Sequence, residues 1–171
     1  SVGKLVPKVR DTAKILYQLY IGITIVCIVV LCLCGVNLFD SLITTFGTVG
    51  TGGFGIYNDS IAGFSPLAQN MVTLFMILSG INYTFYFCLL RRQIKEAFSI
   101  EEVIWYMAII LVSVSAIVVD IRHMYGSLAE TIRHAFFQVG SIITTTGFST
   151  VDFNAWPQMS KTILVILMFI G

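Results

Sequence analysis

The sequence predicts an all-α transmembrane fold built from two similar units, and three observations support this prediction. The chain is 57% hydrophobic and only 11% charged, with a mean hydropathy of +0.90, whereas soluble domains carry about 25% charged residues. Uncharged apolar stretches long enough to cross a bilayer separate the few charged residues. A pattern rich in glycine and threonine occurs twice, at 48–55 and at 142–149, which indicates an internal repeat.

The first unit is predicted over residues 1–95, and it begins with a span at about 15–38. The 25 positions between Lys14 and Asp40 carry no charge. As a helix they would be about 37 Å long, which is enough to cross a bilayer. A second span is predicted at about 66–90, where a proline opens another uncharged apolar run.

The stretch between these two spans is too rich in glycine and threonine for a lipid-exposed helix. Each glycine costs about 1 kcal/mol in a helix interior, and threonine is also a weak helix former. We therefore expect a short half-helix at about 38–47, with Asn37 as its N-cap and Asp40 in its first turn. An extended filter loop at 48–55 is expected to follow it.

The second unit is predicted over residues 96–171 and repeats the same order. Ser127 and Glu130 have the spacing of a capping box, which predicts the start of a half-helix. The expected elements are a span at about 102–122, the half-helix at about 128–142, a filter loop at 143–149 and a truncated span at 157–171.

The direction of the chain indicates what such a unit does. A half-helix that re-enters the membrane ends near its middle, and its C-terminus carries about half a negative elementary charge, which favours a cation. Non-helical backbone is tolerated at this depth only where it lines an enclosed or water-filled cavity. There the carbonyl oxygens of a loop can replace the water shell of an ion, and glycine supplies the positive φ values that such a loop needs. The repeat therefore predicts a cation pore.

The distribution of charge predicts the orientation in the membrane. The net charge of +1 gives no indication of a nucleic-acid partner. Seven of the ten basic residues precede the first span or lie between the second and third. The positive-inside rule then places the N-terminus and the 91–102 loop in the cytoplasm. The predicted outer side carries the acids Asp40, Asp59, Asp120, Glu130 and Asp152.

Two motifs resemble those of the Trk/Ktr/HKT superfamily of potassium transporters, most closely its TrkH-type membrane subunits. The segments Thr51-Gly-Gly-Phe-Gly55 and Thr144-Thr-Thr-Gly-Phe-Ser149, the latter followed by Asp152-Phe-Asn-Ala-Trp-Pro157, look like the second and third filter segments of that family. The segment 78–83 is similar to the inner end of a second-repeat helix. The resemblance implies a potassium-channel-like fold, of which this chain is a fragment with two of the four expected repeats.

The resemblance also implies a function and a set of partners. It implies potassium ion uptake across the plasma membrane, here a bacterial inner membrane, with potassium as the only bound metal and no organic cofactor. The implied partners are membrane lipid, a second copy in a homodimer, and a cytosolic nucleotide-binding regulatory subunit of the TrkA or KtrA kind. Whether transport is channel-like or coupled to protons or sodium is left open by the sequence.

Residue by residue, the resemblance implies three groups of site residues. Gly53 and Gly147 occupy the glycine position that marks selectivity for potassium over sodium. Gly80 lies at the position that matches Gly171, and both are candidate hinge or gate-adjacent positions, with close helix packing as the alternative for Gly80. The filter carbonyls are expected from Thr51, Gly52, Gly53, Thr145, Thr146 and Gly147, and the filter flanks are Val49, Gly50, Phe54, Ile143, Thr144 and Phe148.

The sequence is also compared with other functions that a membrane protein can have, and each makes its own demand on the residues. Two alternative functions stay open. The chain could belong to a sodium-conducting or sodium–potassium symporting relative, or to a non-conducting membrane scaffold subunit. An intramembrane protease would need a paired serine or aspartate dyad within the spans, but the interiors of the spans, such as 103–119, contain no acid and no His–Ser pair. The match of 50–55 to a dinucleotide fingerprint lacks the strand before it and the acid about 20 residues after it. We therefore expect that the chain is not an enzyme.

Overall fold

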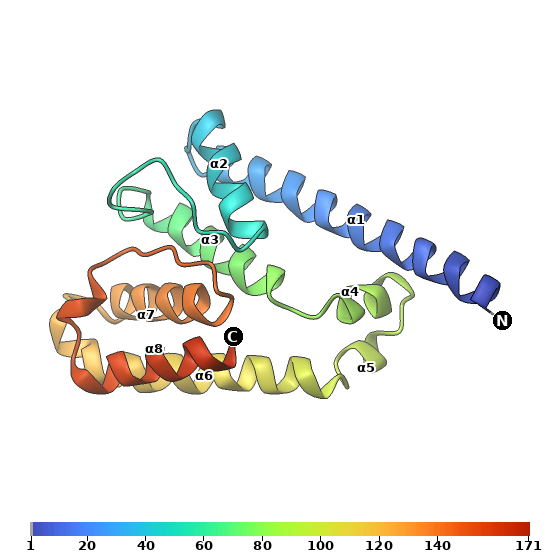
Figure 1. Cartoon of the computed structure of the whole chain (residues 1–171). Helices are drawn as coiled ribbons and strands as arrows, with labels where there is room; N and C mark the ends of the chain where they lie inside the picture. Colours follow the sequence, from blue (N-terminus) through green and yellow to red (C-terminus); the bar gives the residue numbers. More distant parts are fainter. Residues whose placement is uncertain (1) are drawn as a thin grey trace.

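The computed structural model describes residues 2–171, and within this range every regular element is a helix. The prediction of an all-α fold is therefore confirmed. Figure 1 shows a long N-terminal helix lying across one side of a bundle of shorter ones. The helices are α1 (Val2–Leu33), α2 (Leu38–Val49), α3 (Pro66–Ser79), α4 (Tyr83–Leu90), α5 (Ile94–Ala97), α6 (Glu101–Ile121), η1 (Arg122–Met124), α7 (Leu128–Ile143), η2 (Phe153–Ala155) and α8 (Gln158–Ile170).

Two segments of the described chain are long and apolar enough to cross a membrane. They are Ala13–Leu33 within α1 and Glu101–Met124, which comprises α6 and the short helix after it. The helices α2 and α8 are apolar but shorter than a span. The lengths follow from the uncharged runs of the sequence, because about 20 helical residues are needed to cross the hydrocarbon core.

The predicted span at about 66–90 is broken in the structure. The helices α3 and α4 meet at an angle of 89°, and the break falls at Gly80. The last carbonyls of α3 have no partner within the helix. The Tyr106 hydroxyl donates to the Ile77 carbonyl oxygen at 3.1 Å. The Asn82 side chain accepts from the Thr84 N–H and so begins α4 as a separate helix. Hydropathy cannot reveal such a break, since both helices are apolar.

The two half-helix segments begin at the residues that the sequence indicates. The Asn37 side chain accepts a hydrogen bond from the Asp40 N–H at 2.9 Å and caps α2. The Ser127 hydroxyl accepts from the Glu130 N–H at 3.1 Å and caps α7. In each case an otherwise unpaired N–H of the first turn is satisfied, and an acid lies at the positive end of the helix dipole.

The second half-helix, α7, contacts helices of both units. Figure 1 shows α7 between α3 on one side and α6 and α8 on the other. Phe137 of α7 and Phe148, which follows it, are buried in the core of the first unit with Leu31, Val49 and Met76. Because lipid is as apolar as these side chains, close van der Waals packing stabilises this contact in a bilayer more than removal from water does. The two units therefore form one body.

Candidate functional site

The first loop (residues 50–55) follows α2 and opens with a helix cap of the Schellman type. The Gly52 N–H donates to the Gly47 carbonyl oxygen at 2.9 Å, and the Thr51 N–H donates to Thr48 at 3.2 Å. The Gly53 N–H also donates to the Gly47 oxygen, at 3.1 Å. Thr51 and Gly53 have positive φ values of 48° and 64°. The backbone thus reverses direction within three residues after the half-helix ends.

The second loop (residues 144–149) repeats these bonds 94 positions later. The Thr146 N–H donates to the Ser141 carbonyl oxygen at 2.9 Å, and the Thr145 N–H donates to Ile142 at 3.0 Å. The Gly147 N–H also donates to the Ser141 oxygen, at 3.3 Å. Thr145 and Gly147 have φ values of 57° and 88°. The internal repeat seen in the sequence is therefore a repeat of backbone geometry, hydrogen bond by hydrogen bond.

These bonds fix the direction of the neighbouring carbonyl groups. All peptide bonds of the described chain are trans, so the N–H of one residue and the carbonyl of the residue before it point in opposite directions. The N–H groups of Gly52 and Gly53 point back to the end of α2. The carbonyls of Thr51 and Gly52 therefore point away from it. By the same argument, the carbonyls of Thr145 and Thr146 point away from the end of α7.

The two loops lie against each other. A Cβ atom on Gly53 would lie only 1.8 Å from the Thr146 carbonyl oxygen, so the backbone of one loop touches the carbonyl of the other. Further along, the Ser149 N–H donates to the Ser60 hydroxyl at 3.2 Å, and the Ile61 N–H donates to the Ser149 carbonyl at 3.1 Å. Residues 88 to 93 positions apart in the sequence thus meet at one place.

The flanking residues differ between the loops in burial. Val49, Ile143 and Thr144 are buried at the ends of the half-helices, whereas Gly50 is exposed. Phe148 is buried against Gly47, where its ring lies 2.8 Å from the position of a Cβ atom. The Phe148 carbonyl accepts from the Ser141 hydroxyl at 2.6 Å.

Its counterpart Phe54, in contrast, is 81% exposed. Gly52, Thr145 and Gly147 are exposed as well. The buried Phe148 side chain thus anchors the second loop in the core, whereas the corresponding side chain of the first loop, Phe54, is exposed.

The two predicted hinge glycines follow α3 and α8, and both pack against the C-terminal end of α7. A Cβ atom on Gly80 would lie 2.8 Å from Thr144 Cγ2 and 2.5 Å from the Tyr106 hydroxyl oxygen. A Cβ atom on Gly171 would lie 2.2 Å from the Ile143 carbonyl oxygen. Figure 1 shows the C-terminal end of the chain beside the end of α7. Gly80 therefore packs beneath the loop of the second unit and not beneath its own.

The acids near the N-terminus of α2 serve local structure. The Asp40 carboxylate is buried and accepts hydrogen bonds from the Tyr57 hydroxyl at 2.6 Å and the Asn37 amide at 2.7 Å. The bond to Asp40 raises the pKa of the Tyr57 phenol, with smaller contributions from burial and from the charge of Asp59. A cavity of about 420 Å³ opens beside these side chains. It lies at the beginning of α2, and Ser60, which binds the second loop, is one of its lining residues.

Sequence reasoning missed the residues that join the loops. Ser60 is joined to the second loop across 89 positions, and no spacing rule connects the two. The role of Ser141 follows more readily from the repeat. Ser141 lies 94 positions after Gly47, and the carbonyl oxygens of these two residues accept equivalent hydrogen bonds in the two loops. Within residues 2–171 there is no cluster of three or more histidine, cysteine, aspartate or glutamate side chains suited to a metal ion.

Comparison with known proteins identifies a family with this architecture. The sequence model of the family TrkH, described as a cation transport protein, matches residues 2–104 and 98–171. The Trk system potassium uptake protein TrkH of Escherichia coli strain K12 is 34% identical over 173 residues, which cover 99% of this chain and 36% of that protein. TrkG of the same strain is 31% identical over 98% of this chain and 35% of that protein.

A solved structure shares the fold. The crystal structure of the potassium transporter TrkH from Vibrio parahaemolyticus superposes with a TM-score of 0.88 at 28% identity, and the match covers 94% of this chain and 36% of that one. The chain thus spans about a third of the length of the relatives that it matches.

Proposed function

The chain belongs to the TrkH family of cation transport proteins, and we propose that it supplies two of the units that surround a potassium-conducting pore. The relatives that it matches are named as potassium uptake proteins. Since the chain spans only about a third of their length, the complete pore needs units outside it.

The proposed ion path follows the carbonyl groups of the two loops. Its ligands are the backbone oxygens of Thr51, Gly52, Thr145 and Thr146, with Gly53 and Gly147 continuing the path. The observation that carries this proposal is the orientation of these carbonyls. They point away from the half-helices, and the Thr146 oxygen reaches the neighbouring loop. Carbonyl oxygens that point away from two half-helices, at the negative ends of their dipoles, favour a dehydrated cation.

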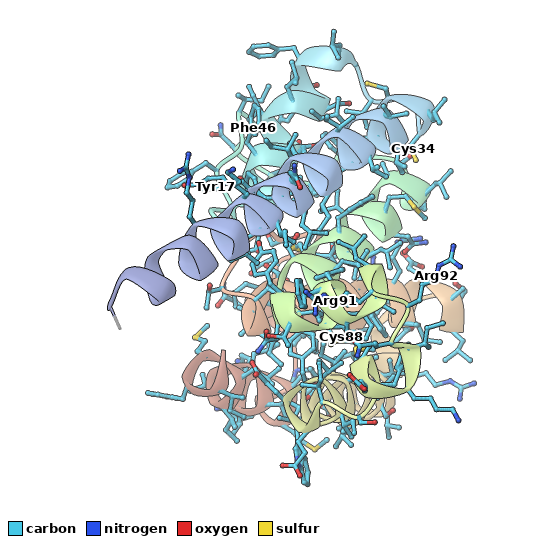
Figure 2. The ribbon with its side chains drawn as sticks, turned by 90° about the vertical axis from the view of Figure 1, so that its right-hand side faces the viewer. Tyr17, Cys34, Phe46, Cys88, Arg91 and Arg92 are labelled. Atoms are coloured by element: carbon cyan, nitrogen blue, oxygen red, sulfur yellow. The ribbon has the colours of Figure 1, made fainter. Side chains whose placement is uncertain are left out.

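The proposed topology places the α4–α5 region in the cytoplasm. Figure 2 shows Arg91 and Arg92 on the turn after α4, near Cys88. Both arginines and Lys95 are exposed, and the positive-inside rule favours the cytoplasmic side for such a cluster. We further propose, from family membership, that the complete protein forms a homodimer and works with a cytosolic nucleotide-binding regulatory subunit. This basic surface faces the compartment in which that subunit would bind.

The test is serine in place of Gly147 in the full-length protein. No atom lies within 4 Å of the position of a Cβ atom there, so the side chain fits without a clash. The positive φ of 88° is unfavourable for serine, and the backbone must adjust where the ion passes. We expect the variant to admit sodium and to lose preference for potassium, measured as cation uptake into vesicles that contain the purified protein.

The matched control is serine at Gly126. This glycine also has open space at its Cβ position, but its φ is not positive and it precedes α7, outside the loops. The control variant should transport as the unmodified protein does. Equal ion preference in the Gly147→Ser variant and the control would contradict the proposed path. Equal uptake of sodium and potassium by the unmodified protein would instead favour a sodium-conducting relative, and absence of any uptake would favour a scaffold subunit.

A further inference from the structure

We propose that a groove between α3 and α7 binds an anionic membrane phospholipid, with Arg133 holding its phosphate group. The groove has a volume of about 550 Å³. One side is formed by Asn70, Thr73, Leu74 and Ile77 of α3, and the other by Ala129, Ile132, Arg133 and Phe136 of α7. On each helix the spacing is i, i+3, i+4, i+7, so two continuous helix faces form the walls.

Arg133 is the only charged residue that lines this groove, and no ion-pair partner lies within 4 Å of it in the described chain. Its Nε atom is buried and has no hydrogen-bond partner. The nearest acid on the same helix, Glu130, lies instead 3.9 Å from His134 Nε2. A guanidinium group with a buried, unsatisfied donor is costly in an apolar environment, so an anion from outside the chain is expected to pair with it.

The depth of the groove identifies the source of that anion. Arg133 lies five residues, or about 8 Å, from the beginning of α7. Asn70 lies four residues from the beginning of α3, at a similar depth. In the proposed topology both helices begin at the outer surface of the bilayer, so this depth is close to the boundary between headgroups and hydrocarbon, where lipid phosphates are the abundant anions. A guanidinium group binds phosphate with paired, charge-assisted hydrogen bonds.

The rest of the groove fits an acyl chain. Below Arg133 the walls are Leu74, Ile77, Phe136 and Thr73, whose hydroxyl already donates to the Gln69 carbonyl oxygen, so they offer little to a soluble anion. The single uncompensated positive charge favours a lipid with one net negative charge, such as phosphatidylglycerol, over a zwitterionic one. In the first unit the position 94 residues earlier is Phe39, which carries no charge. The site is therefore specific to the second unit.

The inference requires that the chain lies in a bilayer, but it does not depend on the ion that is transported. The experiment uses the full-length protein in detergent, with bound lipids removed, and native mass spectrometry to follow binding of added phosphatidylglycerol. We expect one tightly bound lipid. The Arg133→Gln variant should bind it at least about tenfold more weakly, the loss of one charge-assisted contact, and Arg133→Lys should recover part of the affinity.

Two controls complete the experiment. Arg122→Gln changes an exposed arginine outside the groove, and it should bind lipid as the unmodified protein does. Leu74→Trp should weaken binding by filling the groove while Arg133 is retained. Equal affinity of the Arg133→Gln variant and the Arg122→Gln control would overturn the proposal. So would equal binding of phosphatidylcholine, displacement of the lipid by inorganic phosphate at similar concentration, or a segment of the complete protein filling the groove.

Discussion

Alanine at Gly53 should damage the protein much more than alanine at Gly147, although the two glycines occupy equivalent positions. Both have positive φ values, which cost an alanine about 1–2 kcal/mol. At Gly147 the new methyl group meets no atom within 4 Å, so no further cost arises. At Gly53 it would lie 1.8 Å from the Thr146 carbonyl oxygen, whereas a relaxed contact is about 3.3 Å. One backbone must therefore move by about 1.5 Å, which adds roughly 1–3 kcal/mol, as overpacking does.

The assay compares both variants in the full-length protein, by thermal unfolding in detergent and by the rate of potassium uptake. Gly53→Ala should unfold at a distinctly lower temperature than Gly147→Ala and should lose uptake. The control is Gly22→Ala, since this glycine lies in α1 and has open space around its Cβ position. Equal losses of stability in the Gly53 and Gly147 variants would refute the reasoning, because they would show that the loops do not touch as described.

Two further predictions concern the contacts of Asp40 at the beginning of α2 and of Gly80 at the end of α3. The bond to Asp40 raises the pKa of the Tyr57 phenol, so its stabilising effect should be complete below about pH 10 and disappear as the pH rises through the folded-state pKa. Asp40→Asn should lower that pKa, measured by phenolate absorbance with Tyr57→Phe as reference, and an unchanged titration would contradict the bond. Gly80→Ala should be destabilising because the methyl group meets the Tyr106 hydroxyl. The double variant with Tyr106→Phe should lose less stability than the two single losses combined, and strict additivity would exclude the contact.

Much of the fold follows from local rules that the sequence displays. Uncharged stretches predict the long helices because a bilayer sets their length. Asn37 and Ser127 predict the starts of α2 and α7 because each places a hydrogen-bond acceptor beside unpaired N–H groups. The repeat at 48–55 and 142–149 predicts two matching loops. The assignment of those loops to an ion path stays a prediction.

The remaining features depend on contacts between distant residues. The break between α3 and α4 is stabilised by Tyr106, which lies 29 positions from the carbonyl that it binds. Gly80 is recognisable as a special position, but only the fold shows that it packs against Thr144 of the other unit. Likewise, Ser60 and Ser149 meet because the two loops are adjacent. Periodicity and capping describe each unit alone, so they do not predict how one unit contacts the next.

The threonines at the two helix caps bear on the proposed ion path. A Schellman cap explains the positive φ of Thr51 and Thr145, but that position normally carries glycine, since a side chain there costs about 1–2 kcal/mol. A β-branched residue in this region is rare. Threonine occupies this position in both loops, although glycines lie close to it in each. In the second copy the Thr145 hydroxyl donates to the Thr144 carbonyl oxygen at 2.7 Å, a bond that glycine could not make. A pair of loops that must hold carbonyl groups in fixed directions gains from a residue with fewer accessible conformations than glycine.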